Sequence, residues 1–225
     1  MNVKQLLTAG LLTSTAVLGF GAIAPARAGG FYEYSYEFDR DDVTRIDNNK
    51  CAACYNVDGR PIGVNDTNGI YEEISVSYNE ATQTLNWSSL FTKQGSNFID
   101  GGWLVISDGP NPKNDPLEYA IYYLDGQNET LTAFAYNGKN NSGSWQSNPF
   151  LGSWTDALNY TTDGDTSELS FSIDISGLNS ALGGDWKGSA FAEEVGLWFH
   201  AGRNTSVEYT YDSNGSISGI SSFSS

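Results

Sequence analysis

Two tryptophans in a polar segment offer the chemistry that sugar recognition requires. Trp145 and Trp154 lie in residues 137–154, and the many Asn, Ser and Gly residues of this segment predict a loop. The C–H faces of sugars stack on flat aromatic rings, while sugar hydroxyls need amide or carboxylate partners. Rings on a loop are less committed to a core than Trp87, whose alternating neighbours predict a strand. We therefore expect Trp145 and Trp154 to bind a ligand, unless they cover an edge of the core.

Trp198 and His200 form a second candidate binding pair. Residues 195–201 alternate at period two, so these two side chains share one face of a predicted strand. The odd-numbered residues of the segment make the more apolar face, and we expect that face to be core. His200 is the only histidine of the chain. A single histidine on a strand can be purely structural, so both roles stay open.

Acidic turns are the candidate places for a metal ion. Asp163 and Asp165 flank Gly164 in one such turn, and Ca²⁺ takes about six to eight oxygen ligands. No acidic run of the chain matches the full D-x-[DN]-x-[DN]-G loop with its closing Glu. Because turns rich in Asp and Asn need no metal, we expect no cofactor, with calcium at Asp163 and Asp165 as the alternative.

Cys51 and Cys54 are the only cysteines, and they flank two alanines. This spacing also occurs in redox sites, zinc sites and haem attachment. Here the pair lies in a loop-like run, no His follows Cys54, and the remaining zinc ligands would have to be carboxylates. In an exported chain the pair therefore predicts a short-loop disulfide.

The spacing of the acids argues against catalysis. The carboxylates suited to glycoside hydrolysis are Glu168, Asp174, Glu193 and Glu194. No run follows the E-x-D-x-x-E type of pattern of jelly-roll hydrolases. A serine nucleophile would need His200 as its base, and no G-x-S-x-G run is present. We expect no enzymatic activity, with a glycoside hydrolase as the alternative.

The first 28 residues have the pattern of a signal peptide. Lys4 precedes an apolar stretch from Leu6 to Ala24, and Ala26-Arg27-Ala28 offers an A-x-A cleavage site. We expect general secretion and a mature chain that begins at Gly29, located in the periplasm, on the cell surface or in the medium. An uncleaved anchor is the alternative, and no transmembrane span is expected in the mature chain.

The charge balance excludes one class of partner. The chain carries 27 Asp and Glu against 11 Lys and Arg, a formal net charge of -16 at pH 7. Nucleic acids and anionic membranes are repelled by such a surface. The acidity itself indicates solubility outside the cell.

Turn signals and alternating residues predict an all-β fold. Asx-Gly pairs such as Asp58-Gly59 and Asp125-Gly126 mark tight turns, and apolar and polar residues alternate between them. About nine strands are expected. They span residues 32–38, 74–78, 85–91, 102–107, 118–124, 131–136, 168–175, 195–201 and 206–211.

These strands favour an antiparallel, jelly-roll-like β-sandwich, with a closed β-barrel as the alternative. We expect one domain at residues 29–212, followed by a Ser/Gly-rich tail or edge strand at residues 213–225. A single helical turn is expected within residues 176–182, with Ser176 as its cap.

Four segments carry a resemblance to a known group. Residues 102–113, 169–178, 186–188 and 195–200 resemble secreted bacterial proteins of the PEP-CTERM-sorted kind, for which no activity is implied. The sequence ends without the Pro-Glu-Pro sorting signal of that group.

A second resemblance concerns the fold. The strand at residues 170–175, the short turn with Leu178 and the later strand near Val195 are similar to the ending of DOMON-like and family 9 carbohydrate-binding sandwiches. The resemblance implies sugar or haem as the ligand. Haem in those modules uses axial Met and His, and the only Met of this chain is the initiator, so sugar is the expected ligand.

Together these patterns predict a secreted, non-catalytic β-sandwich that binds extracellular or cell-envelope carbohydrate. The alternative is a structural or adhesive matrix protein that self-associates through Tyr-rich strands such as residues 32–38.

Overall fold

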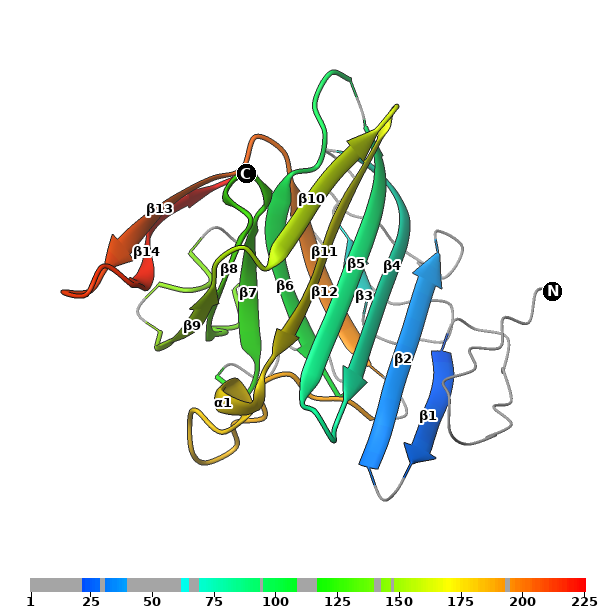
Figure 1. Cartoon of the computed structure of the whole chain (residues 1–225), viewed down its shortest axis with the longest axis vertical. Coiled ribbons are helices and arrows are strands. Elements are labelled where there is room, and N and C mark those ends of the chain that lie inside the picture. Colours follow the sequence, from blue (N-terminus) through cyan, green and yellow to red (C-terminus); the bar gives the residue numbers. More distant parts are fainter. Residues whose placement is uncertain are drawn as a thin grey trace.

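The computed structural model describes residues 22–28, 31–39, 62–64, 69–93, 95–108, 117–139, 143–146, 148–192 and 195–225. Within these ranges the fold is all-β, with one short α-helix, α1 (Ser176–Asn179), and one 3₁₀ turn, η3 (Gly126–Asn128). Two six-stranded sheets face each other and do not close into a barrel (Figure 1). The predicted β-sandwich is therefore confirmed, and the barrel alternative is wrong.

The first sheet is antiparallel throughout. Its strand order is β1 (Ala22–Ala28), β2 (Phe31–Asp39), β4 (Gly69–Asn79), β5 (Thr84–Lys93), β11 (Thr166–Asp174) and β10 (Leu158–Asp163). Alternation at period two gives β4, β5 and β11 one buried face and one more polar face. On the polar face, Ser75 and Ser88 are joined by a hydrogen bond of 2.7 Å, and Asn86 donates to Ser77.

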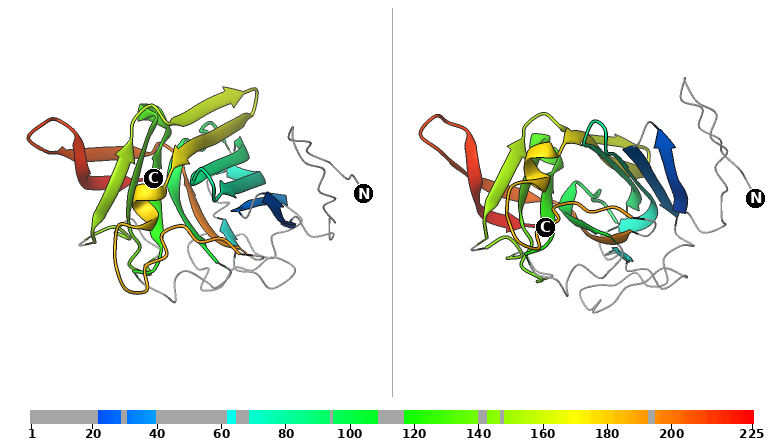
Figure 2. Two further views of the ribbon diagram at one scale, coloured as in Figure 1. Left: turned by 60° about the horizontal axis from the view of Figure 1, so that its bottom comes forward. Right: turned by 90° about the horizontal axis from the view of Figure 1, so that it is seen from below.

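The second sheet has the order β3 (Ile62–Val64), β12 (Gly196–Gly202), β6 (Gly101–Ser107), β7 (Ala120–Asp125), β8 (Thr130–Ala135) and β9 (Phe150–Trp154). Its pairs are antiparallel except β3 with β12. A separate hairpin is formed by β13 (Ser206–Tyr211) and β14 (Ile217–Ser224). Figure 2 shows the hairpin, in orange and red, projecting away from the two facing sheets.

The main core lies between the two sheets. Leu85, Trp87 and Phe91 enter it from β5, as their alternation predicts. Phe199 of β12 meets the Trp87 ring edge-on at 5.2 Å between centroids, a favourable aromatic geometry. The odd-numbered residues 195–201 are all buried in this core, so the predicted core face of that strand is confirmed.

A second apolar cluster covers the outer face of the second sheet. Strands β6, β7 and β8 are buried along their whole length, because their residues are largely apolar on both faces. Trp103, Ile121 and Phe134 belong to this cluster, and so do Ile220 and Phe223 of the hairpin. The Phe223 ring lies 4.7 Å from the Tyr123 ring, so the base of the hairpin is packed onto the sheet.

Several elements differ from the predicted ones. Residues 150–154 form β9 and residues 158–163 form β10, so the prediction of a loop up to Trp154 is wrong at its end. The carboxylate of Asp174 accepts from the backbone N–H of Ser176 at 2.8 Å, and Ser176 is the first residue of α1 and not its cap. Residues 213–225 contain β14.

Three expectations concern the N-terminal part of the chain and the membrane. Residues 22–28, the end of the predicted leader, form β1 and pair with β2. Cys51 and Cys54 lie outside the described residues. In the described part of the chain, no helix has the length and apolar character needed to cross a membrane.

Candidate functional site

The hairpin and the β9 edge of the second sheet enclose a groove of about 660 Å³, a volume usual for small-molecule sites. We call it the hairpin groove. Its walls come from β13, the β13–β14 turn, the end of β9 and the segment around η3. The lining residues are Asn128, Thr130, Ser153, Thr155, Val207, Tyr209, Tyr211, Gly215, Ser216 and Ile217.

Alternation along β13 builds the aromatic wall. Val207, Tyr209 and Tyr211 are two residues apart, so their side chains share one face of the strand. Val207 pairs with Phe223, which is buried against the second sheet, whereas Tyr211 lies at the tip of the hairpin. The base of the hairpin is therefore anchored. The Tyr211 side chain at the tip is 62% exposed.

The opposite wall is polar and also follows from alternation. Ser153 and Thr155 line the groove, and Trp154 between them turns to the other side of β9, where it packs against the main core. Asn128 of η3 and Thr130 of β8 continue this wall. The Thr130 hydroxyl donates to the backbone carbonyl of Asn128 at 2.7 Å. The side-chain carboxamide of Asn128 is bonded to a different group.

The carboxylate of Asp125 links the two walls of the groove, and Asp125 is only 1% exposed. Its Oδ2 accepts from the Tyr209 hydroxyl at 2.8 Å and from Asn128 Nδ2 at 2.7 Å. Its Oδ1 accepts from the backbone N–H of Asn128 at 3.2 Å. Hydrogen bonds to an ionised acceptor are stronger than neutral ones. One carboxylate thus holds both walls of the groove in place.

The electrostatics of Tyr209 agree with this positioning role. Burial raises the pKa of the Tyr209 hydroxyl, and the hydrogen bond to Asp125 raises it further. The hydroxyl therefore stays protonated and donates to the carboxylate at neutral pH. A general base needs the opposite shift, so Tyr209 is suited to orient its ring and not to accept a proton.

The lining offers stacking and hydrogen bonding. The lining residues include Tyr209 and Tyr211, the amide residue Asn128 and four residues with hydroxyl groups. These four are Thr130, Ser153, Thr155 and Ser216. Among the described residues that line the groove, none is Asp or Glu. Glycosidic bond cleavage normally requires two carboxylates across the substrate. The described lining residues therefore offer aromatic rings and hydrogen-bonding groups, and no pair of carboxylates.

The first pair predicted from the sequence lies elsewhere and is divided between two clusters. Trp145 packs on Phe134 at 5.7 Å between ring centroids, on the outer face of the second sheet. Trp154 packs toward the main core, with its ring 6.4 Å from that of Tyr122. Neither ring lines the hairpin groove.

The second predicted pair lies in a stack of aromatic rings. Trp103 is parallel to Trp198 at 6.3 Å and to His200 at 5.3 Å. Trp198 is 7% exposed, and burial lowers the pKa of the His200 imidazole. The stack joins strands β6 and β12, with Trp103 and Trp198 buried and His200 partly exposed.

One carboxylate of the predicted calcium turn forms an ion pair with a lysine. Asp165 lies 2.7 Å from the ammonium of Lys93, and Thr166 donates its hydroxyl to the Asp163 carbonyl. The residues that the structure describes contain no group of three or more His, Cys, Asp or Glu arranged to hold a metal ion.

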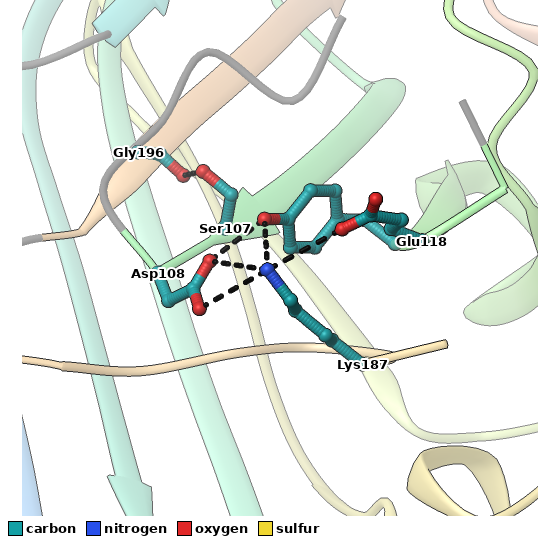
Figure 3. A network of polar contacts seen from close by, with 6 residues as sticks. Ser107, Asp108, Glu118, Lys187 and Gly196 are labelled. Atoms are coloured by element: carbon teal, nitrogen blue, oxygen red, sulfur yellow. Dashed lines mark hydrogen bonds and ion pairs between the residues drawn. The ribbon is translucent and has the colours of Figure 1, made fainter. Parts of the chain in front are cut away.

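A second polar cluster lies where β6 ends and β7 begins (Figure 3). Lys187 is within 3.4 Å of Asp108 and 3.3 Å of Glu118, and the Tyr119 hydroxyl donates to Asp108 at 2.7 Å. Burial and this bond raise the pKa of Tyr119, and the hydrogen bond with Tyr119 raises that of Lys187. These contacts link the ends of β6 and β7 to the segment that carries Lys187.

Tyr209 and Tyr211 were not singled out from the sequence. The signal was present, because residues 206–211 were predicted as a strand in which Val207, Tyr209 and Tyr211 alternate with Ser206, Glu208 and Thr210. The alternation shows that the three side chains share a face. It does not show that the strand extends past the sheet it packs on, because that depends on contacts with distant residues.

No protein-family model, curated protein or solved structure was found to match this chain. The site is therefore interpreted from its own geometry and chemistry.

Proposed function

We propose that this protein is an exported, non-catalytic carbohydrate-binding protein that holds a glycan in the hairpin groove. Export is inferred from the signal-peptide pattern of residues 1–28, and the proposed location is the periplasm, the cell surface or the medium. The ligand is an extracellular or cell-envelope polysaccharide.

The observation that carries the proposal is the exposed ring of Tyr211 beside a fixed ring of Tyr209. Sugar recognition combines apolar stacking with a few placed hydrogen-bonding groups. Here Tyr211 is exposed at the hairpin tip, Tyr209 is held by Asp125, and the facing wall supplies an amide and hydroxyls. A wall that is already positioned loses less entropy when a ligand binds.

The described structure gives the self-association alternative no comparable support. Tyr34, Tyr36 and Phe38 of β2 are buried in the main core, so these rings are unavailable to a second molecule. Of the four aromatic residues in that stretch, only Tyr32 is exposed, at 37%.

The test is a glycan array followed by polysaccharide pull-down, with calcium and with chelator. We expect saturable binding that survives chelation. Replacing Tyr211 with Ala removes the exposed ring and should weaken affinity about ten-fold, which corresponds to about 1.4 kcal/mol of stacking. The matched control is Tyr32→Ala, another exposed tyrosine, on β2 far from the hairpin (Figure 1).

Three other outcomes would contradict a glycan site in the hairpin groove. Affinity lost on Trp145→Ala or Trp154→Ala, in folded variants, and kept in Tyr211→Ala would return the site to the tryptophans. Binding abolished by chelator would transfer it to a calcium site. No binding to any glycan would contradict the proposal.

A further inference from the structure

The chain segments that build the hairpin groove all carry acidic residues and no basic ones. Residues 125–131, 152–158 and 206–218 contain five carboxylates and neither Lys nor Arg. The five are Asp125, Glu129, Asp156, Glu208 and Asp212. Glu208 alternates with the lining residues Val207 and Tyr209 and therefore lies on the other face of β13. Charges of one sign near a concave site still repel an anion that approaches it.

The lining itself is uncharged. Among the described residues that line the groove, none carries a formal charge. Asp125 lies beneath the groove, and its oxygens already accept from Tyr209 and Asn128. Asp212 accepts from the backbone N–H groups of Asn214 and Ser216 at 2.8 and 3.0 Å, which holds the hairpin turn. The contact surface is thus neutral while its surroundings are negative.

This arrangement opposes an anionic ligand. A uronate or sulfate in the groove would find hydroxyl and amide groups but no Lys or Arg among the lining residues. It would also experience repulsion from the surrounding carboxylates and from a chain of net charge -16.

A cationic sugar would gain less binding free energy in the groove than the net charge of the chain suggests. An ammonium group needs a carboxylate within contact distance for a strong pairing, and no lining residue supplies one. Attraction from the exposed carboxylates acts through water and is screened by salt.

We propose that the hairpin groove takes an uncharged polysaccharide segment and rejects anionic ones. This selectivity rests on the proposed function, because it names the ligand class of that same groove. Selection occurs by repulsion around a neutral contact surface, which is a form of specificity that does not require contact with the rejected ligand.

The test uses pairs of polymers that share a backbone and differ in charge at one substituent. One pair is a uronic acid polymer and its carboxyl-reduced product, and the other is chitin oligosaccharide and its deacetylated form. Affinities are measured in about 10 mM and about 1 M salt, where the screening length is about 30 Å and about 3 Å. We expect the carboxyl-reduced polymer to bind at least about ten-fold more tightly than the uronate at low salt, with the difference shrinking at high salt.

A charge-removed variant tests the cause. Glu129 and Asp156 both have positive φ, at 52° and 57°, and neither lines the groove. Glu129→Gln with Asp156→Asn keeps side-chain size, and Asn is well tolerated at positive φ. We expect neutral affinity to be unchanged and uronate affinity to rise by a few-fold at low salt.

The results distinguish failure of the charge selectivity from failure of sugar binding. Equal binding of uronate and reduced polymer at low salt, or tighter binding of the deacetylated than of the acetylated oligosaccharide, overturns the selectivity and leaves the sugar-binding groove in place. Failure of every polymer, and of every glycan on the array, to bind at either salt concentration contradicts the proposed function itself.

Discussion

Removing one hydroxyl from Tyr209 should loosen the hairpin from the body of the protein. Tyr209→Phe deletes the donor that lies 2.8 Å from Asp125 Oδ2 and keeps the ring. Asp125 is almost fully buried, so water cannot easily replace the lost bond. A hydrogen bond to a charged group contributes about 1.5–3 kcal/mol. We therefore expect the free energy of unfolding to fall by about 2 kcal/mol.

Thermal unfolding followed by circular dichroism measures this loss. For a domain of this size, about 2 kcal/mol corresponds to a fall in Tm of about 4–8 °C. The control is Tyr211→Phe, which removes a hydroxyl from the exposed tyrosine of the same strand face and should change stability by no more than about 0.5 kcal/mol.

A double-mutant cycle with Asp125→Asn isolates the contact. If Tyr209 stabilises the protein through Asp125, Tyr209→Phe should cost at least about 1 kcal/mol less in the Asp125→Asn background than alone. Equal Tm values for Tyr209→Phe and Tyr211→Phe, or strictly additive effects in the cycle, would refute the role assigned to this carboxylate.

Two further predictions concern the sheets. Burial raises the pKa of the hydroxyls of Tyr122, Tyr123 and Tyr136, so the stability they contribute is fully present below the unfolded pKa near 10 and is lost as the pH rises above it. Urea unfolding at stepped alkaline pH should show a loss of about 4 kcal/mol per pH unit above about pH 10, and a flat profile there would contradict it. Gly102 has φ of 144°, and a Cβ there would collide with the His200 carbonyl of the neighbouring strand, so Gly102→Ala should cost at least about 2–3 kcal/mol in a melting experiment. The control Gly177→Ala, at a position with open space, should leave Tm unchanged or slightly raised, and equal behaviour of the two variants would argue against the close strand approach.

The strands were predictable where one face is apolar and the other polar. In β5, Leu85, Trp87 and Phe91 alternate with polar or small residues, and the alternation alone assigns their faces. The opposite signal marks β6 to β8, whose near-continuous apolar runs indicate burial on both faces. Local pattern is sufficient here because the side-chain period of a strand is fixed at two.

The site was less predictable because exposure is decided by distant contacts. Trp154 was expected on a loop, yet β9 pairs with β8 and turns its ring to the core. Trp198 shares a face of β12 with His200 as predicted, but the Trp198 ring is buried in the second apolar cluster and only His200 is partly exposed. Tyr211 looks like any strand tyrosine in the sequence. It is exposed only because the hairpin packs by its base and extends past the sheet.

The most direct test of the account is hydrogen–deuterium exchange with and without a saturating neutral oligosaccharide found on the array. If the hairpin groove binds the sugar, protection should increase in residues 128–130, 153–155 and 207–217, the segments that line it. No change is expected in residues 32–38 of the first sheet. Protection centred on residues 143–146 or 198–200, with the hairpin unaffected, would contradict the account.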